Sequence, residues 1–330
     1  MKKMDPEELK SRAKDIVTEA FVVDGHASSL FDAVNGIRDL REKSESGHLD
    51  IPRLKEAGVS CQVFAAFADQ RKTPMRACRR GLVYSDAFHS LAGEQGVRVI
   101  SSFADIEAVK ETKELGIMFA LEGGEFLEGE IAVLHMFYKL GARIIGLTWD
   151  ERNELGDGAG EAMTKGGLTR FGFSVLKEAQ SMGMIVDVSH LSEAGFWDVV
   201  ENASLPVIAS HSNCHKLYPH PRNLKDEEMK ALRDTGGLIG ISFNPSYLGA
   251  GGEITVSTVA DHIEHALDVM GESCVGLGSD FDSFSGPGPV PSVEHLPVLV
   301  EELLKRNLDV GVIENVLGLN YLRVFRAVMG

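Results

Sequence analysis

Four side chains that can bind a metal or move a proton each follow a short apolar run. They are Glu122, His190, His211 and Asp280, in the segments ALEGGE, VDVSHLSE, VIASHSN and VGLGSDFD. Short apolar runs rich in β-branched residues predict buried parallel strands, and the carboxyl ends of such strands carry the chemistry of a (β/α) barrel. Two imidazoles and two carboxylates that meet at one barrel face predict a metal centre. His26, which ends the run FVVDGH, is predicted to be a further member.

Strand-like and helix-like segments alternate along the whole chain. Helical patterns cover residues 130–141, 168–183, 227–236 and 259–271, and each ends on a glycine, which suits the left-handed residue after a helix. Eight strands are predicted, at residues 21–26, 59–67, 116–123, 142–149, 184–190, 206–211, 238–244 and 274–280. Strand and helix in eight repeats predict an α/β fold of the (β/α)8 TIM-barrel type.

A doubly wound open sheet is the competing fold. Such a sheet would place its ligand at one switch point rather than at the ends of many strands. A Gly-rich phosphate-binding fingerprint is also missing, because GLGSDF and GAGGE lack its spacing and context. The barrel is therefore preferred, with the leading segment up to Glu19 and the tail at 312–330 as additional N- and C-terminal helices outside it.

Length, charge and cysteine content set limits on the class of protein. The chain has 330 residues, 44% of them hydrophobic, which suits a single metal-dependent hydrolase barrel domain at 1–330. A formal net charge of -16 opposes binding to nucleic acid or anionic lipid. No segment approaches the roughly 20 apolar residues of a membrane span, and the leading segment is charged throughout, so the cytoplasm is the expected location. The four cysteines form no C-x-x-C pair, which predicts reduced thiols. The expected partner is a small molecule, and a homodimer is left open.

Several short motifs extend this reading to a known family. The chain resembles the membrane dipeptidase family (renal dipeptidase, peptidase M19) of the amidohydrolase superfamily. The resemblance covers residues 22–325, and its motifs occur in order along the chain. They are VDGH (23–26), LEGG (121–124), LTW (147–149) followed by NELGDG (153–158), DVSH (187–190), SHSN (210–213), PRNL (221–224), GSDFD (278–282) and GLNYLRV (318–324).

The resemblance implies a set of metal ligands. In that family two zinc ions share a bridging glutamate, which matches Glu122. One metal is completed by two histidines, which match His190 and His211. The other is completed by a histidine-x-aspartate pair on the first strand, where this chain has His26 and Ser28.

The resemblance also implies the residues that handle the substrate. The family's arginine that holds the substrate carboxylate matches Arg222, and its acid/base aspartate matches Asp280. A guanidinium offers a planar fork suited to a carboxylate. A zinc ion lowers the pKa of its water from about 15.7 towards about 7, so the expected nucleophile is a metal-activated hydroxide that attacks a short amide, with Asp280 passing the proton to the leaving amine.

Ser28 departs from the family at the first metal position. A neutral hydroxyl is a much poorer ligand for a dication than a carboxylate, because it supplies no charge. Asp24 and Asp32 are the neighbouring carboxylates, and the sequence assigns neither as a replacement. We therefore expect one firmly bound zinc, completed by His190 and His211.

Trp149 is the second departure. Many family members have a histidine here that contacts the substrate near the bond to be cleaved. Tryptophan cannot act as acid, base or cation, although its ring N–H can donate one hydrogen bond. This substitution predicts a changed substrate preference at a substrate-binding residue rather than loss of activity.

Three functional classes follow from these residues. The leading one is a zinc dipeptidase, a metalloprotease acting in proteolysis, that hydrolyses dipeptides or similar small amides bearing a carboxylate. The second is another amidohydrolase reaction, such as lactone or cyclic-amide hydrolysis, and the third is a metal-depleted, non-catalytic paralogue. The presence of His190, His211, Arg222 and Asp280 opposes the third, since a mere binding scaffold has no chemical need for the acid/base aspartate. The other histidines are expected to be structural or solvated: His48, His89, His135, His215, His220, His262, His265 and His295.

Overall fold

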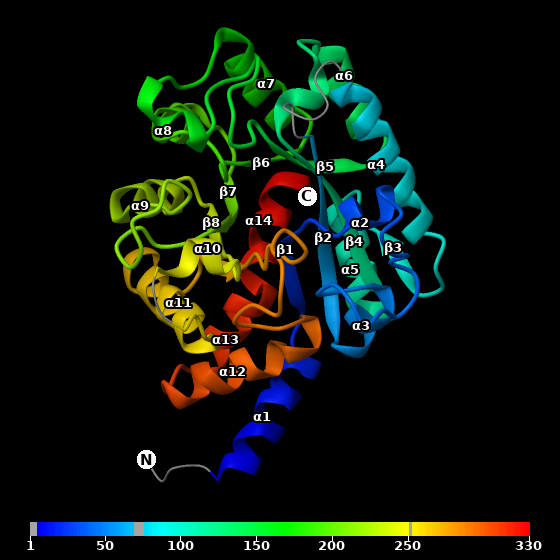
Figure 1. The fold of residues 1–330 in the computed structure, drawn as a ribbon, viewed down its shortest axis with the longest axis vertical. Coiled ribbons are helices and arrows are strands. Elements are labelled where there is room, and N and C mark those ends of the chain that lie inside the picture. Colours follow the sequence, from blue (N-terminus) through cyan, green and yellow to red (C-terminus); the bar gives the residue numbers. More distant parts are fainter. Residues whose placement is uncertain (1–4, 69–75, 251–252) are drawn as a thin grey trace.

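Nine parallel strands form one sheet in the part of the chain that the computed structural model describes, residues 5–68, 76–250 and 253–330 (Figure 1). The sheet closes on itself because β2 pairs with both β1 and β4, while β9 pairs with both β8 and β1. The barrel strands are β1 (Val22–Ala27), β2 (Val59–Phe67), β4 (Leu115–Glu122), β5 (Ala142–Gly146), β6 (Ile185–Asp187), β7 (Ile208–Ser212), β8 (Leu238–Ile241) and β9 (Val275–Leu277). The predicted eight-stranded (β/α)8 barrel is confirmed.

One short strand, β3 (Val97–Val99), was not predicted. It pairs with the first residues of β4, from Leu115 to Ile117, and β5 pairs with the later residues of β4. It therefore extends the sheet outside the closed ring. Its three residues are only partly buried, and they form no apolar run from which the sequence could have indicated a strand.

Helices surround the barrel (Figure 1). The four predicted helical patterns correspond to α6, α7, α9 and α11, and the glycines that follow them, Gly141, Gly183, Gly236 and Gly271, all have positive φ as expected. The helices are α1 (Pro6–Glu19), α2 (Leu30–Val34), α3 (Ile51–Glu56), α4 (Ala77–Leu91), α5 (Phe103–Thr112), α6 (Ile131–Lys139), α7 (Arg170–Ser181), α8 (Glu193–Asn202), α9 (Asp226–Asp234), α10 (Pro245–Leu248), α11 (Val256–Met270), α12 (Leu296–Lys305), α13 (Val310–Glu314) and α14 (Asn320–Met329). Short 3-10 turns lie at Gly124–Leu127, Ala159–Thr164 and Val293–His295, and a π-helical turn at Asn315–Leu319 joins α13 to α14.

The two terminal helices add to the barrel as predicted. Helix α1 packs against α12 at one end of the molecule (Figure 1). Helix α14 makes a contact that the sequence did not indicate, because its fully buried Tyr321 lies against β1, β8 and β9. A Cβ atom at Gly25, Gly240 or Gly276 would overlap the Tyr321 side chain, so these strands need glycine where the tyrosine approaches. The tail thereby closes one end of the barrel.

The core has two layers, separated by the strands. Alternate strand residues fill the inside of the barrel, including Val63, Ala120 and Ile185. The residues between them, such as Phe64 and Ile239, pack outwards against the helices. This alternation follows from the two-residue period of a strand, and each large side chain removed from water contributes about 1.5–3 kcal/mol.

The predictions about cysteines and membrane spans can be compared with the structure. Cys61, Cys78, Cys214 and Cys274 are all free thiols, as predicted. Among the described residues, no helix is both long enough and apolar enough to cross a membrane.

Candidate metal centre and active site

The predicted site residues meet at the carboxyl ends of the barrel strands. Glu122 is the last residue of β4, while His26 and His211 lie within β1 and β7. His190 and Asp280 lie three residues beyond the ends of β6 and β9, so these two strands end earlier than predicted. All five side chains are buried.

The backbone at two of these positions is unusual. His190 has a φ of 69° and Asp280 a φ of 60°, both in the left-handed region. This conformation costs a residue with a side chain about 1–2 kcal/mol, and it tends to persist at functional sites. The turns after β6 and β9 therefore hold these side chains in directions that a regular strand would not give them.

An extra residue in each of two strands also directs a histidine into the barrel. Between Asp24 and Ala27, β1 has one more residue than the facing segment of β2, and β7 has one more than β8 between Ala209 and Ser212. Such irregularities re-aim side chains. They allow His26 and His211 to face the same interior space, where their rings stack with centroids 3.7 Å apart.

Three imidazole nitrogens converge on one carboxylate oxygen. The Nε2 atoms of His190, His26 and His211 lie 2.9, 3.5 and 3.5 Å from Oε1 of Glu122. Nε2 of His190 lies 2.9 Å from Nε2 of His211, and the buried Nε2 of His26 has no hydrogen-bond partner among the described residues. Imidazole nitrogens and a carboxylate are the ligands that zinc prefers. The set fits a divalent cation, as the sequence predicted.

The charges in this cluster favour a bound positive charge. Burial alone would raise the pKa of Glu122, but His26 and His190 outweigh it and hold that pKa well below its usual range. Burial would lower the pKa of His26, but the carboxylates of Glu122, Asp280 and Asp187 together raise it to about 9. Burial and the neighbouring cationic groups lower the pKa of His211 well below its usual value. The cluster thus holds a proton where it could hold a cation, with His211 neutral.

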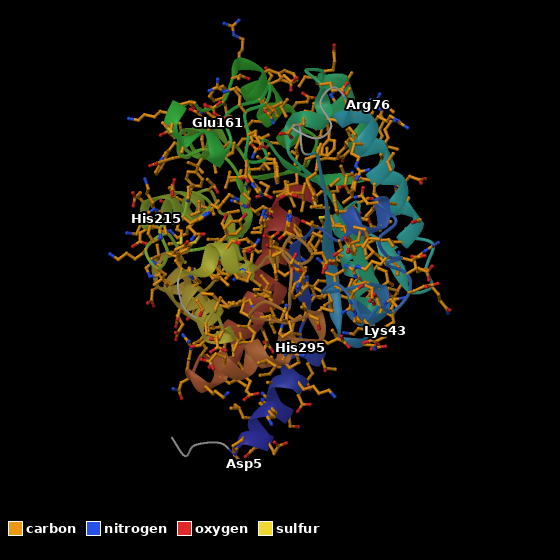
Figure 2. The ribbon with its side chains drawn as sticks, in the orientation of Figure 1. Asp5, Lys43, Arg76, Glu161, His215 and His295 are labelled. Carbon is orange, nitrogen blue, oxygen red and sulfur yellow. The ribbon has the colours of Figure 1, made fainter. Side chains whose placement is uncertain are left out.

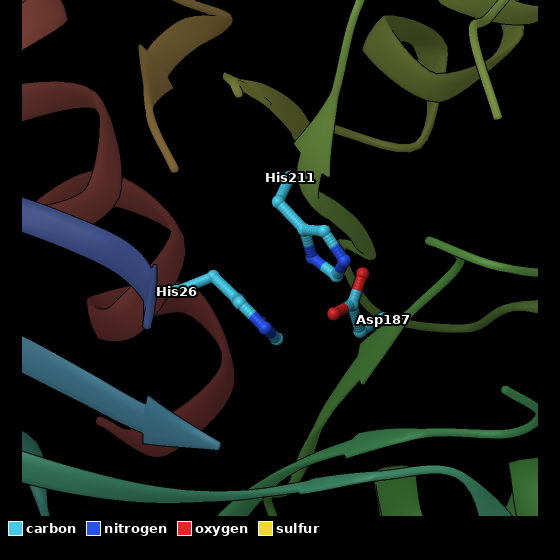
Figure 3. A group of neighbouring side chains, drawn as sticks. All are labelled: His26, Asp187 and His211. Atoms are coloured by element: carbon cyan, nitrogen blue, oxygen red, sulfur yellow. The ribbon is translucent and has the colours of Figure 1, made fainter. Parts of the chain in front are cut away.

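A second group of candidate ligands lies beside the first. It consists of His26, Asp187 and His211, which come from β1, β6 and β7 (Figure 3). Glu122, His190 and His211 form the first group. His211 belongs to both groups, because one of its ring nitrogens faces Glu122 and the other faces Asp187 through Ser210.

Ser28 is buried at the mouth of the site, and neither neighbouring carboxylate replaces it. Asp24 accepts hydrogen bonds from the backbone N–H and the hydroxyl of Ser279, at 2.8 and 2.6 Å. Asp32 pairs with Nε of Arg38 at 2.6 Å. Both carboxylates are therefore engaged in structural contacts, and the first-strand position has His26 without a partner acid on its own strand.

Asp280 lies beside this incomplete position. Its backbone N–H donates to the carbonyl oxygen of His26 at 3.1 Å, and its Oδ2 accepts from Nδ2 of Asn244 at 3.0 Å. Burial, supported by the charge of Glu122, raises the pKa of the Asp280 carboxyl. A carboxyl group of this kind holds a proton more readily than an exposed aspartate does.

Arg222 is buried beside His211. Its Nη2 donates to the carbonyl oxygen of His211 at 3.2 Å, and its guanidinium lies 5.4 Å from the centre of the Tyr247 ring. Nε lies 3.9 Å from Oδ1 of Asp150, and within the described residues it has no hydrogen-bond partner. A buried donor without a partner carries a desolvation cost of about 1–3 kcal/mol. An anionic ligand that accepted this N–H would remove the cost.

A cavity of about 550 Å³ opens above Glu122 and Asp280. Trp149 forms part of its wall and stacks on Phe67 with ring centroids 5.8 Å apart. Arg222 lies in an adjoining cavity of about 370 Å³, and His190 lines both. A larger hollow of about 770 Å³ is lined by the first residues of β2 and β4, at the opposite ends of these strands, and contains none of the predicted site residues.

Asp150 is a residue of the site that the sequence reasoning missed. Its Oδ1 lies 2.7 Å from Nδ1 of His190. The feature of the sequence that could have identified Asp150 is its position directly after the motif LTW. Ser210 and Asp187 were missed as well, although each stands inside a motif that contains a predicted ligand.

Most of the histidines expected to be structural or solvated lie apart from the cluster. His220 instead lines the cavity of Arg222, and its Nδ1 accepts the backbone N–H of Arg222 at 3.2 Å. Figure 2 labels His215 and His295 on different parts of the molecule, and His295 is exposed while His215 is partly buried. His48 instead bonds to Asp282, and buried His262 accepts the backbone N–H of Cys214 at 3.0 Å. These contacts agree with their predicted roles.

Comparison with known proteins agrees with the predicted family. Residues 10–329 match the family described as membrane dipeptidase, peptidase family M19. Mouse dipeptidase 3 is 30% identical over 97% of this chain and 67% of its own length. A crystal structure described as dipeptidase AC, an M19 metallopeptidase, has a TM-score of 0.87 at 27% identity, covering 94% of this chain and 99% of that one. A metallopeptidase from Rhodobacter sphaeroides, bound to a phosphinate mimic of the dipeptide L-Ala-D-Ala, has a TM-score of 0.85 at 26% identity, with the same shares covered. With the barrel and the cluster around Glu122, these likenesses show that the chain belongs to the membrane dipeptidase family, peptidase family M19, and is a metal-dependent hydrolase.

Proposed function

We propose that the protein is a zinc dipeptidase that hydrolyses the amide bond of dipeptides, or of similar small amides bearing a carboxylate. The observation that carries the proposal is the convergence of three Nε2 atoms on Oε1 of Glu122, within 2.9 to 3.5 Å. Glu122, His190 and His211 would hold the firmly bound ion, and His26 would contribute to a weaker position. A bound zinc ion supplies an activated water and polarises the carbonyl of the substrate.

Asp280 is the proposed acid/base group. Its carboxyl is buried, and Asn244 fixes one of its oxygens at 3.0 Å. Burial raises the pKa of this carboxyl, so it accepts a proton more readily than an exposed aspartate does and can pass that proton to the leaving amine. The hydrogen bond from Asn244 keeps the carboxyl in one orientation during that transfer.

Arg222 is the proposed anchor of the substrate carboxylate. Its Nε, which has no hydrogen-bond partner in the described part of the chain, and its planar fork suit an anion, and Tyr247 supports the guanidinium from one face. The adjoining cavity above Glu122 has an aromatic wall, where Trp149 stacks on Phe67. A tryptophan wall excludes water and favours an apolar side chain or backbone surface of the substrate. The relative that binds a mimic of L-Ala-D-Ala supports a dipeptide of small residues, with a D-residue at its carboxyl end, as the first compound to test.

The test combines metal analysis with a dipeptide panel. Purified protein should contain zinc, hydrolyse dipeptides, lose activity to a chelator and regain it on addition of zinc. The panel should pair L- and D-residues at the carboxyl end and should include a lactone and a cyclic amide. Turnover of the lactone or cyclic amide without turnover of any dipeptide would contradict the proposal.

A matched pair of variants separates the metal centre from general effects on the fold. Glu122→Gln keeps the size of the side chain but removes the charge on which the three rings converge, so zinc and activity should both be lost. Glu130→Gln changes an exposed glutamate directly before α6. It should change neither the zinc content nor the activity. Full activity in Glu122→Gln would show that catalysis does not depend on this cluster.

A further inference from the structure

We propose that Ser210, held by Asp187, is a positioning residue that fixes the ring tautomer of both His26 and His211. In that arrangement each ring directs an Nδ1–H towards Ser210, which leaves Nε2, on the side of Glu122, as the atom that can bind a metal. This inference rests on the proposed metal centre, because the lone pairs that it orients are those of the proposed ligands.

The extra residue in β7 makes this arrangement available. In a regular strand, neighbouring side chains point to opposite faces, so Ser210 and His211 could not meet. Because β7 has one more residue than β8 between Ala209 and Ser212, both side chains can lie on the inner side. Oγ of Ser210 then lies 2.8 Å from Nδ1 of His211, the residue next to it.

Asp187 determines the direction of the Ser210 hydroxyl. Its Oδ1 accepts the backbone N–H groups of Ser189 and Ser210, both at 2.9 Å. Its Oδ2 accepts the hydroxyl hydrogen of Ser210. Asp187 thus acts as the acceptor in all three contacts, and a hydroxyl has one hydrogen, so that hydrogen is committed to Asp187.

The committed hydroxyl can act only as an acceptor towards the two rings. Its oxygen lies 2.8 Å from Nδ1 of His211 and 3.5 Å from Nδ1 of His26. Each ring therefore presents its Nδ1–H to Ser210. This leaves Nε2 as the metal-binding atom of neutral His211, and of His26 once a metal displaces the second proton that its ring holds. Both Nε2 atoms lie 3.5 Å from Oε1 of Glu122, on the side where a metal would bind.

The same contacts explain the second group of candidate ligands. His26, Asp187 and His211 surround a point (Figure 3), but the Ser210 oxygen contacts all three of them. Because the Ser210 hydroxyl lies between these three side chains, we assign them to a hydrogen-bond relay rather than to a third metal position. One serine thus serves a ligand of each proposed metal position, and its loss should weaken both.

Ser210→Ala tests the relay, because it removes the hydroxyl with little change in volume. Zinc affinity, measured by competition with a chelating dye, should fall by about 10- to 100-fold, which is the usual effect of removing a partner of a ligating histidine. Ser210→Thr restores a hydroxyl and should recover most of the affinity. Ser212→Ala, on the same strand and with no hydrogen bond from its hydroxyl among the described residues, is the matched control and should bind zinc as the native protein does.

A spectroscopic measurement makes the test independent of the metal. Two-bond proton–nitrogen NMR of metal-free protein, labelled at histidine with nitrogen-15, should show Nδ1–H for His211 in the native protein and a mixture of tautomers in Ser210→Ala. Asp187→Asn places an amide donor beside Ser210, so the hydroxyl hydrogen turns to Nδ1 of His211 and the opposite tautomer should appear.

The outcomes separate this inference from the proposed function. Tight zinc binding in both the native protein and Ser210→Ala, with unchanged tautomers, would overturn the relay while the metal centre stands. A native protein without zinc affinity would overturn the proposed function, and the NMR measurement would still decide the relay.

Discussion

Oδ1 of Asp150 lies 2.7 Å from Nδ1 of His190, and the same oxygen lies 3.9 Å from Nε of Arg222. Asp150 thus connects a proposed metal ligand with the proposed substrate anchor. Burial raises the pKa of Asp150, but the hydrogen bond and charge of His190, with the charge of Arg222, outweigh it and lower that pKa. The ionised carboxylate orients His190 and partly neutralises the charge of Arg222.

Replacing Asp150 with asparagine should therefore weaken the metal centre. The amide oxygen can still accept from Nδ1 of His190 but without a charge, so we expect zinc affinity to fall by about 10-fold, and by about 100-fold in Asp150→Ala. Competition with a chelating dye measures both values. Asp234→Asn, at an exposed position on α9, is the control. Equal affinity in Asp150→Ala and native protein would show that His190 needs no such partner.

The barrel strands could be predicted because each contains a short apolar run rich in β-branched residues. The sequence did not indicate the residue at which the hydrogen bonds between neighbouring strands end. The run at 142–149 continues through Leu147 and Trp149, but β5 ends at Gly146, because side-chain type does not report the last backbone hydrogen bond. The three residues of β3 contain no apolar run that could predict a strand, because Arg98 lies at their centre.

The proposed ligands were predicted as a set, but the groups that orient them were not. Glu122 and His211 stand at strand ends, which the sequence marks. The contact between Ser210 and His211 depends on an extra residue in β7, which no spacing reveals and which only the pairing with β8 shows. Asp150 reaches His190 from 40 positions away, so a three-dimensional structure was needed to bring them together.

Replacing Arg222 with lysine should reduce catalytic efficiency on carboxylate-bearing substrates by about 100-fold, since a lysine keeps the charge but loses the planar fork. The loss should be much smaller for a dipeptide whose carboxyl end is an amide, because that substrate offers no carboxylate to the fork. Steady-state kinetics with both substrates measures kcat/KM. Arg233→Lys, partly exposed on α9, is the matched control. The same loss with both substrates would assign Arg222 to structure rather than to anchoring.

Glu228 should make the folded protein less stable as pH rises towards neutrality. Burial is the main cause that raises its pKa from 4.5 to about 7, and its Oε2 accepts the backbone N–H of Lys225 at 2.7 Å. Because the folded pKa lies above the unfolded one, the folded state binds more protons between about pH 4.5 and 7, and the free energy of unfolding falls across that window. The complete shift corresponds to at most about 3 kcal/mol.

Urea unfolding of metal-free protein at pH 5 and pH 7.5 measures this dependence. Glu228→Gln should lose less stability than the native protein between the two pH values, because its side chain does not titrate. Glu227→Gln, at an exposed position in the same turn, should behave like the native protein. Identical losses in all three proteins would contradict the role given to Glu228.

Ser28 should limit the number of firmly held metals to nearer one than two per chain. A hydroxyl in place of a carboxylate removes one negative charge from the position next to His26, and Asp24 and Asp32 are held by Ser279 and Arg38. Ser28→Asp should raise the metal content towards two ions per chain after mild chelation. Ser28→Asn, in which the new side chain has the shape of aspartate but no charge, should not raise it. Elemental analysis of the three proteins decides the matter. Two firmly bound ions in the native protein, with no gain in Ser28→Asp, would mean that another group completes the position, and Asp280, whose backbone already bonds to His26, would be the first residue to replace.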